Sequence, residues 1–317
     1  MRQTFATVSM ALATAALLTA AASSEKQFTI SDNVDLVLLD VSVKNKAGGY
    51  VSGLSQDNFR VLEDGKLRLI THFSSMDAPV CVGLIVDNSG SMRLKRPEVV
   101  TAGLAFAKES NSKDQFFVVN FNERVYFGLS RNLPFTDDLQ TLRRALYYGQ
   151  AIGRTALYDA IAAGLKHLEE CNREMKTLIV VSDGGDNISS IRLPDLWRLL
   201  EASRATIYTI GLLDPEDRDL NPAVLQKIAS ATGGEYFQPD TLNSILPVFE
   251  KISRDIRNRY VIGYTPDEVN DRHEIRKVRV IVQNGEGKLS ARSRTTYTMK
   301  PVTEFVATKT QPDVLHK

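Results

Sequence analysis

The sequence predicts an α/β protein: a doubly wound, mostly parallel sheet in the middle of the chain, flanked by an antiparallel β-sandwich that both chain ends build. Two patterns carry this prediction. Between residues 77 and 256, short continuous apolar runs alternate with helical segments, which is typical of a parallel sheet covered on both faces. On either side of that region, apolar and polar residues alternate one by one, as in strands with one buried face.

The middle region contains four β-branched runs and one shorter run. RVYFGL (124–129) follows the second run so closely that we expect the two to be antiparallel. Helical segments are expected at 96–110, 155–170, 193–204 and 221–234. In such a sheet the ligand site lies at the carboxyl ends of the strands. The four runs are VCVGLIV (80–86), QFFVVNF (115–121), TLIVVSD (177–183) and ATIYTIG (205–211).

The two flanks have the texture of antiparallel strands. Residues 57–73 alternate on both sides of Asp64 and Gly65, and such a pair between alternating strands predicts a hairpin. Near the other end, Val278, Val280 and Val282 share one face of a strand. Neither flank has enough strands for a stable sheet. We therefore expect residues 28–76 and 257–300 to form one discontinuous β-sandwich around an α/β domain at 77–256.

The chain ends and the overall charge limit the possible locations and partners. Residues 1–22 combine one Arg, an Ala/Leu-rich stretch and small residues, which predicts a cleaved signal peptide, with an uncleaved anchor as the alternative. No later stretch is long enough to span a membrane, and residues 301–317 are expected to be a flexible tail. The net charge of +1 comes from interspersed charges, which argues against nucleic acid. We expect an exported protein, periplasmic or extracellular.

The two cysteines, Cys81 and Cys171, allow two interpretations. Exported chains meet oxidising conditions, in which the pair could form a disulfide. Equally, both residues could be small buried hydrophobes.

Polar residues follow two of the predicted strands. Asp87, Ser89 and Ser91 come directly after the first run, where they form either an ordinary turn or a metal loop. Asp183 ends TLIVVSD, which is the fourth strand of the region when RVYFGL is counted and should lie beside the first. Thr155 opens a helix at the same edge. Three distant loops thus offer oxygen ligands to one crevice.

The segments DNSGSM (87–92), GRTALYDA (153–160) and SDGGDN (182–187) resemble the three loops of the metal-ion-dependent adhesion site of von Willebrand factor type A domains. The resemblance covers residues 77 to about 256. The flanking segments GLSQDNFRVLEDG (53–65) and IRNRYVIGYTP (256–266) are similar to a bacterial von Willebrand A-related family.

The resemblance implies a set of ligands and a partner. It implies that Ser89, Ser91 and Thr155 bind a cation through their hydroxyls, and that Asp87 and Asp183 approach it directly or through water. Mg²⁺ or Mn²⁺ suits such oxygen ligands, and an exchangeable position would remain for an Asp or Glu of a protein partner.

Three further residues are candidate partner contacts. Arg154 stands where many members of the superfamily have Gly; it either engages the acidic partner or is solvated. Asp186 and Asn187 lie just beyond Asp183, where they shape the loop or contact the partner.

These residues predict an exported, divalent-cation-dependent, adhesion-type protein-binding module. The four histidines, His72, His167, His273 and His316, lie outside the metal loops, and no P-loop, G-x-S-x-G or HExxH motif occurs, so we expect no enzyme. Two alternatives are an envelope scaffold with a structural metal and a metal-assisted hydrolase.

The segment 244–260 predicts a final helix with one apolar stripe. Ile245, Phe249, Ile252 and Ile256 have helical spacing, and the helix runs into a strand without a flexible linker. Two interpretations stay open: a helix that shifts when an acidic ligand binds, as the resemblance implies, or a static one.

Overall fold

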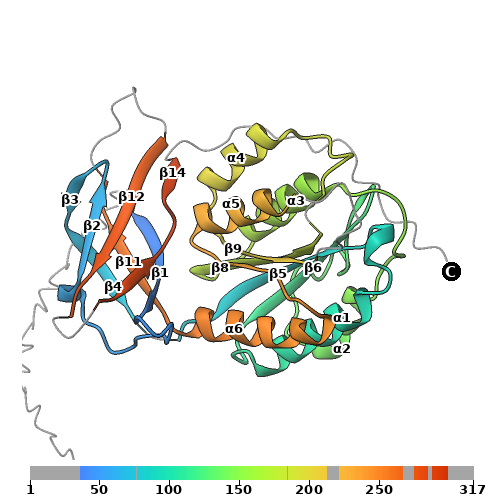
Figure 1. Ribbon diagram of the computed structural model, residues 1–317, viewed down its shortest axis with the longest axis horizontal. Helices are drawn as coiled ribbons and strands as arrows, with labels where there is room; N and C mark the ends of the chain where they lie inside the picture. The colour runs from blue at the N-terminus through green and yellow to red at the C-terminus, as the bar shows by residue number, and fades with distance from the viewer. Residues whose placement is uncertain are drawn as a thin grey trace, which may run out of the picture. The chain divides into compact units, whose positions relative to one another are not determined.

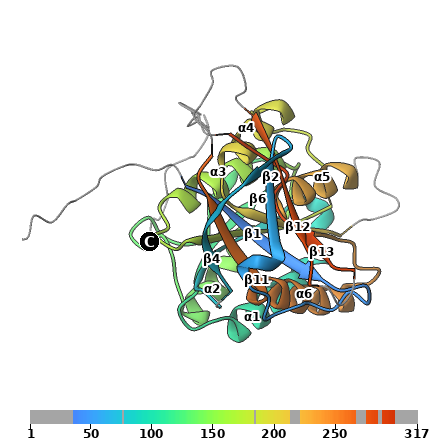
Figure 2. The ribbon, with the colours of Figure 1, turned by 90° about the vertical axis from the view of Figure 1, so that its left-hand side faces the viewer.

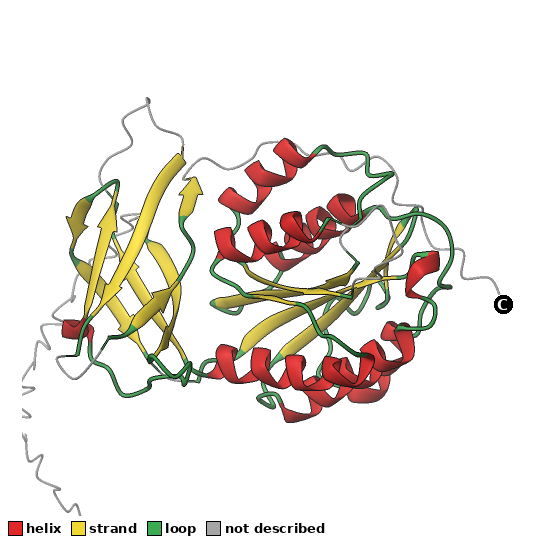
Figure 3. Ribbon diagram, viewed as in Figure 1, coloured by secondary structure: helices red, strands yellow, loops and turns green. Residues whose placement is uncertain are grey.

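The computed structural model describes residues 36–75, 77–183, 185–212, 221–266, 275–284 and 288–298, which fall within one compact unit. Figure 3 shows how helices and strands are distributed over them. The expected signal peptide, the first eight residues of the first β segment and the expected tail lie outside the described residues. Among the described residues, no helix is long and apolar enough to cross a membrane.

The central sheet has the strand order β10-β9-β8-β5-β6-β7. Strand β7 is antiparallel to β6, as the sequence predicts, and the other neighbours are parallel. Strands β5 and β8 are neighbours along residues 80–86 and 175–181. This confirms that the first and fourth strands end at the same edge. The strands are β5 (Val80–Asp87), β6 (Gln115–Phe121), β7 (Val125–Phe127), β8 (Met175–Ser182), β9 (Thr206–Gly211) and β10 (Tyr236–Phe237).

Helices cover both faces of this sheet (Figure 1). One face packs on α1 (Arg96–Glu109), α2 (Leu139–Leu146) and α6 (Ile245–Arg257), and the other on α3 (Leu157–Glu169), α4 (Leu193–Ala202) and α5 (Pro222–Thr232). Helix α2 was not expected from the sequence. Its N-cap is Asp138, whose side chain accepts a hydrogen bond from the Thr141 amide, which satisfies one free donor of the first turn.

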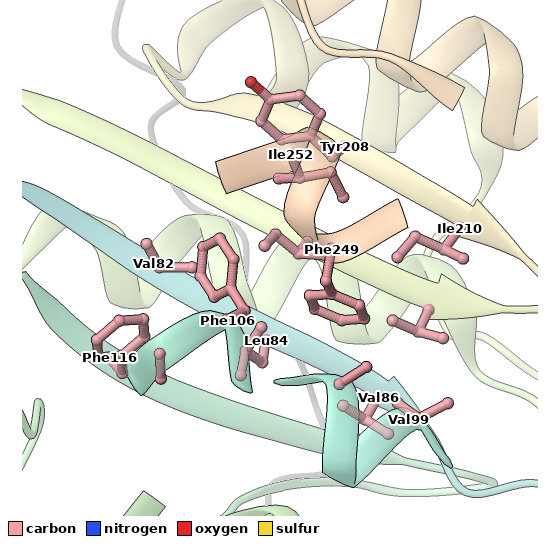
Figure 4. Packing of buried hydrophobic residues seen from close by; sticks show 14 of the residues in the cluster. Val82, Leu84, Val86, Val99, Phe106, Phe116, Tyr208, Ile210, Phe249 and Ile252 are labelled. Carbon is pink, nitrogen blue, oxygen red and sulfur yellow. The ribbon is translucent and has the colours of Figure 1, made fainter. Parts of the chain in front are cut away.

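The final helix buries the predicted stripe. Ile245, Phe249, Ile252 and Ile256 are all buried, and Phe249 packs beside Phe106 in the apolar cluster over the sheet (Figure 4). Burying a side chain of this size stabilises a fold by roughly 1.5–3 kcal/mol. The stripe therefore holds α6 firmly against the domain.

The flanking strands form two antiparallel four-stranded sheets, ordered β13-β1-β11-β4 and β14-β12-β2-β3. Each sheet combines strands from both ends of the described chain, and one apolar cluster lies between them. Asp64 and Gly65 adopt the positive φ values of 48° and 81° at the β2–β3 turn, which confirms the predicted hairpin. The strands are β1 (Val37–Lys44), β2 (Phe59–Glu63), β3 (Lys66–Arg68), β4 (Ile70–Ser74), β11 (Arg259–Tyr264), β12 (Ile275–Val282), β13 (Ser290–Arg292) and β14 (Thr296–Thr298).

A buried charge cluster joins the α/β domain to the sandwich. Asp255, on the last turn of α6, accepts hydrogen bonds from Arg259 at 2.9 Å, Arg292 at 2.7 Å and Ser42 at 2.5 Å, and another from the Tyr208 hydroxyl. These partners lie on β11, β13, β1 and β9. Asn258 alone separates α6 from β11, so the junction is short and internally paired.

Cys81 and Cys171 form a disulfide, with their Cα atoms 6.6 Å apart. Cys81 lies near the start of β5, and Cys171 lies between α3 and β8. This answers the question that the sequence left open. The bridge lies at the amino end of the strands, away from the edge that carries Asp87.

Candidate metal centre

Two acidic side chains meet at the carboxyl edge of the central sheet. Asp87 is the last residue of β5, and Asp183 directly follows β8. Because these parallel strands are neighbours in register, their ends meet at the same place. Asp87 is fully buried and Asp183 is 3% exposed.

The loop after β5 connects the two carboxylates through serines. The Ser89 amide donates to Asp87 Oδ1 at 2.8 Å, and the hydroxyls of Ser89 and Ser91 lie 3.1 Å apart. Ser91 Oγ then donates to Asp183 Oδ2 at 2.5 Å. The short helix η2 (Gly90–Met92) curves the chain so that both serines stay at the edge. The structure thus brings four of the five predicted ligands into one connected group.

Thr155 lies on a second loop that contacts both of the others. Backbone hydrogen bonds join Gly90 to Gly153 at 3.1 Å and Ile152 to Asn88 at 2.9 Å. On the other side, the Thr155 amide donates to Asn187 Oδ1 at 3.0 Å. Thr155 is buried, and its backbone forms its hydrogen bonds to Asn187. Its hydroxyl is therefore placed near the group by its loop and not by a direct bond to the other four side chains.

The electrostatics of this edge are unusual for a protein interior. Burial, and after it the nearby carboxylate of Asp183, raises the pKa of Asp87 to about 7, although hydrogen bonds from Ser182 and Ser89 act against the shift. Within the described ranges no Lys or Arg forms an ion pair with either carboxylate. Buried charges are normally paired or coordinate metals.

The donor set fits a hard cation. Carboxylate and hydroxyl oxygens are the ligands that Mg²⁺ takes in proteins. No group of three or more His, Cys, Asp or Glu residues is placed to hold a metal in the part of the chain that the structure describes. A centre here therefore requires the hydroxyls of Ser89, Ser91 and Thr155 in addition to the two carboxylates.

The three candidate partner contacts have defined roles in the loops. Asp186 Oδ1 accepts hydrogen bonds from the Tyr158 amide at 3.1 Å and from Ser189 Oγ at 2.5 Å. Asn187 holds the Thr155 amide. The exposed side chain of Arg154 donates to the Asn187 carbonyl. Asp186 and Asn187 thus shape the loop around Thr155, and Arg154 lies over it.

Two residues that sequence reasoning did not select also build the centre. Ser182 Oγ donates to Asp87 Oδ2 at 2.6 Å, and buried Asn88 donates its side-chain amide to the Tyr148 carbonyl at 3.3 Å. Ser182 is polar at the end of an otherwise apolar run. A polar residue at the end of a buried strand, directly before Asp183, was the sequence signal that could have identified Ser182 as part of the site.

Comparisons with known proteins agree with this fold. Residues 82–185 match the family model of the von Willebrand factor type A domain. A solved von Willebrand factor type A protein from Catenulispora acidiphila is similar at 16% identity and a TM-score of 0.51, over 82% of this chain and 74% of that one. A search of curated proteins found no significant match.

Two other solved structures are similar over a smaller share of this chain. One is the von Willebrand factor domain of the type V pili tip protein Mfa5 from Porphyromonas gingivalis, at 14% identity and a TM-score of 0.48, over 62% of this chain and 100% of that one. The other is BatB from Bacteroides thetaiotaomicron, at 18% identity and a TM-score of 0.45, over 56% and 97%.

At 16% identity, the similarity to the Catenulispora acidiphila structure supports the fold alone. The family match covers β5 from residue 82, all five predicted ligand residues and β8. Residues 82–185 are therefore similar to a von Willebrand factor type A domain, and antiparallel sheets flank the α/β region.

Proposed function

We propose that this chain is an exported, divalent-cation-dependent protein-binding module. Asp87, Ser89, Ser91, Thr155 and Asp183 would hold Mg²⁺ or Mn²⁺, and an Asp or Glu of the partner would complete the metal's ligands. Asp186 and Asn187 would keep the Thr155 loop in place, and Arg154 would be the nearest cation to the captured carboxylate.

One observation carries the proposal. Two buried carboxylates, Asp87 and Asp183, lie at one sheet edge without a basic partner among the described residues, and Ser91 connects them at 2.5 Å from Asp183 Oδ2. A bound cation would supply the missing positive charge and accept a further oxygen ligand. Ser91 is exposed, so the group opens to solvent on that side.

The surroundings of the centre support a protein as the partner. Leu94, just after η2, is 82% exposed, and Ile152, whose backbone bonds Asn88, is 49% exposed. A partner protein would gain free energy by covering exposed apolar side chains of this kind. A partner that places an acidic residue on the metal would cover both side chains.

The positions of the histidines support binding over catalysis. His72 lies on β4 in the sandwich, and His167 packs against the rings of Phe117, Phe127 and Phe135. A metal-assisted hydrolase usually needs a base beside the ion. His273 and His316 lie outside the described residues.

Calorimetric titration of the full exported chain with MgCl₂ tests the proposal. We expect saturable binding to wild type, and none to Asp87→Ala, because that change removes one of the two proposed carboxylate ligands. The matched control is Asp137→Ala, an exposed Asp elsewhere in the chain, which should bind as wild type. Equal affinity in Asp87→Ala and wild type would remove the metal centre.

A further inference from the structure

Strands β12 and β13 follow each other in the sequence but do not pair. β12 pairs with β2 along residues 278–282, whereas β13 pairs with β1 in the other sheet. The second neighbour of β12 is β14, which pairs with residues 275–277, and the Val278 amide donates to the Thr295 carbonyl at 2.8 Å. The second half of β12 and the outer side of β13 thus face each other without a strand between them (Figure 2).

A groove of about 730 Å³ lies in this gap. Its walls include the consecutive residues 278–282 on one side and 289–295 on the other. Side chains in a strand alternate between two faces, so what consecutive residues share is the backbone edge. The groove therefore runs along two strand edges, and Ser230 and Glu235 of the α/β domain close one end.

The lining of the groove is apolar inside and basic at the rim. Val278, Val280 and Val282 are buried residues of the sandwich core, and Leu289 and Ala291 pack against the same core. The charged lining consists of four cations and one carboxylate: Lys44, Arg279, Arg292, Arg294 and Glu235.

The four cations differ in how they are paired. Lys44 and Arg292 both contact Glu235, and Arg294 donates to backbone carbonyls. Arg279 is exposed, and no acid of the described residues pairs with it. Arg292 also pairs with Asp255 at 2.7 Å and Arg294 is buried, so Arg279 is the positive charge of the groove that no described acid offsets.

We propose that this groove binds an extended, acidic segment of a partner protein, which adds as a β-strand between β12 and β13. Strand edges present backbone donors and acceptors that pair readily with an added strand. The four residues 279–282 of this edge correspond to roughly 13 Å of strand. The ligand would turn alternate apolar side chains toward the valines and alternate carboxylates toward Arg279 and Lys44.

The proposal does not depend on the metal centre. The groove is lined by the sandwich, by Ser230 of α5 and by Glu235. Asp87 and Asp183 lie elsewhere, at the carboxyl edge of the central sheet. The two sites would contact different features of a partner: the metal takes a single carboxylate, and the groove takes an extended backbone.

Fluorescence anisotropy with a labelled peptide, Glu-Val-Glu-Val-Glu-Val-Glu, tests the groove on the full exported chain in EDTA. We expect saturable binding that weakens as salt rises. The same peptide with N-methyl groups on alternate residues should not bind, because it cannot complete the ladder. A Lys-Val peptide of the same length should not bind either.

Two variants locate the binding. Arg279→Glu should weaken the peptide about tenfold, since it reverses the unpaired charge at the rim. Lys277→Glu is the matched control: it is exposed on the same strand but does not line the groove, and it should bind as wild type. Asp87→Ala should also bind as wild type, which separates this result from the metal proposal.

Four results would overturn the proposal. They are absence of saturable binding, equal binding of the N-methylated peptide, and equal effects of the two charge reversals. The fourth is binding that appears only after residues 299–317 are removed, which would assign the groove to the chain's own C-terminal segment.

Discussion

Asp255 and Asp87 are both buried carboxylates, but their surroundings are opposite. The Asp255 carboxylate accepts hydrogen bonds from Arg259, Arg292, Ser42 and Tyr208. Although burial raises its pKa, the two arginines more than offset this and lower the pKa below the usual value. Asp87 has only hydroxyl and amide donors and a second carboxylate nearby, and its pKa is raised.

The difference separates a structural charge from a candidate binding charge. The chain supplies the counter-charge of Asp255 from two strands, β11 and β13, so that cluster is complete and holds α6 to the sandwich. The described chain supplies no such counter-charge to Asp87 and Asp183. A ligand gains the most binding free energy where it pairs a buried charge that the protein itself leaves without a counter-charge.

The largest expected effect is at the complete cluster. Asp255→Asn leaves the buried guanidinium of Arg259 without its carboxylate, which typically costs about 3–5 kcal/mol. Arg292 is half-buried and keeps its contact with Glu235. Urea denaturation followed by circular dichroism measures the change. The control, Asp137→Asn, should alter the free energy of unfolding by less than about 0.5 kcal/mol because the residue is exposed.

The effect of Asp255→Asn on the free energy of unfolding should depend on pH. Because the pKa of Asp255 is lowered in the folded state, its stabilising contribution is present above the unfolded pKa of about 4 and is lost as pH falls further. The difference in unfolding free energy between wild type and Asp255→Asn should therefore shrink below about pH 4. A constant difference down to pH 2 would contradict the role assigned to the ion pairs.

Removal of the disulfide tests whether the amino edge of the central sheet, where the bridge lies, affects metal binding at the carboxyl edge. Replacing both Cys81 and Cys171 by Ala removes a cross-link between residues 90 apart, and we expect a loss of about 2–4 kcal/mol in urea denaturation. Mg²⁺ affinity should not change, because six residues of β5 place Asp87 roughly 20 Å from Cys81. A loss of affinity in the folded variant would show that the edges are coupled.

Much of the fold could be predicted because its signals are local. Continuous apolar runs separated by amphipathic segments identify a parallel sheet, and the α6 stripe is regular over three turns. Helix α2 escaped prediction because it is only eight residues long and buries just Leu142, Ala145 and Leu146. The sequence also did not reveal that β12 and β13 lie in different sheets. That separation depends on strands distant in the sequence, because β12 pairs with β2 and β13 pairs with β1.

The candidate centre was predictable to a different degree. The rule that parallel strands end at one edge was enough to group Asp87, Ser89, Ser91 and Asp183. Ser182, which donates a hydrogen bond to Asp87, was not selected, although it is the polar residue at the end of an apolar run. Pairing of Cys81 with Cys171 could not be decided, because it depends on how the α3–β8 loop is placed beside β5.

The smallest expected effect is at Ser91, the exposed member of the centre. Ser91→Ala removes one proposed cation ligand and the hydrogen bond to Asp183 Oδ2, while Asp87, Ser89, Thr155 and Asp183 remain. Titration with MgCl₂ should show affinity about tenfold lower, which corresponds to about 1.4 kcal/mol.

Stability in EDTA separates a ligand role of Ser91 from a structural one. The free energy of unfolding of Ser91→Ala should stay within about 0.5 kcal/mol of wild type, because Ser91 is exposed and water can replace its hydroxyl at Asp183. Ser130→Ala, at another exposed loop position, should match wild type in both measurements. Unchanged Mg²⁺ affinity in Ser91→Ala would remove Ser91 from the ligands. A large loss of stability in EDTA would instead make the Ser91–Asp183 bond structural, and the centre would then resemble the Asp255 cluster, in which the chain satisfies its own buried charge.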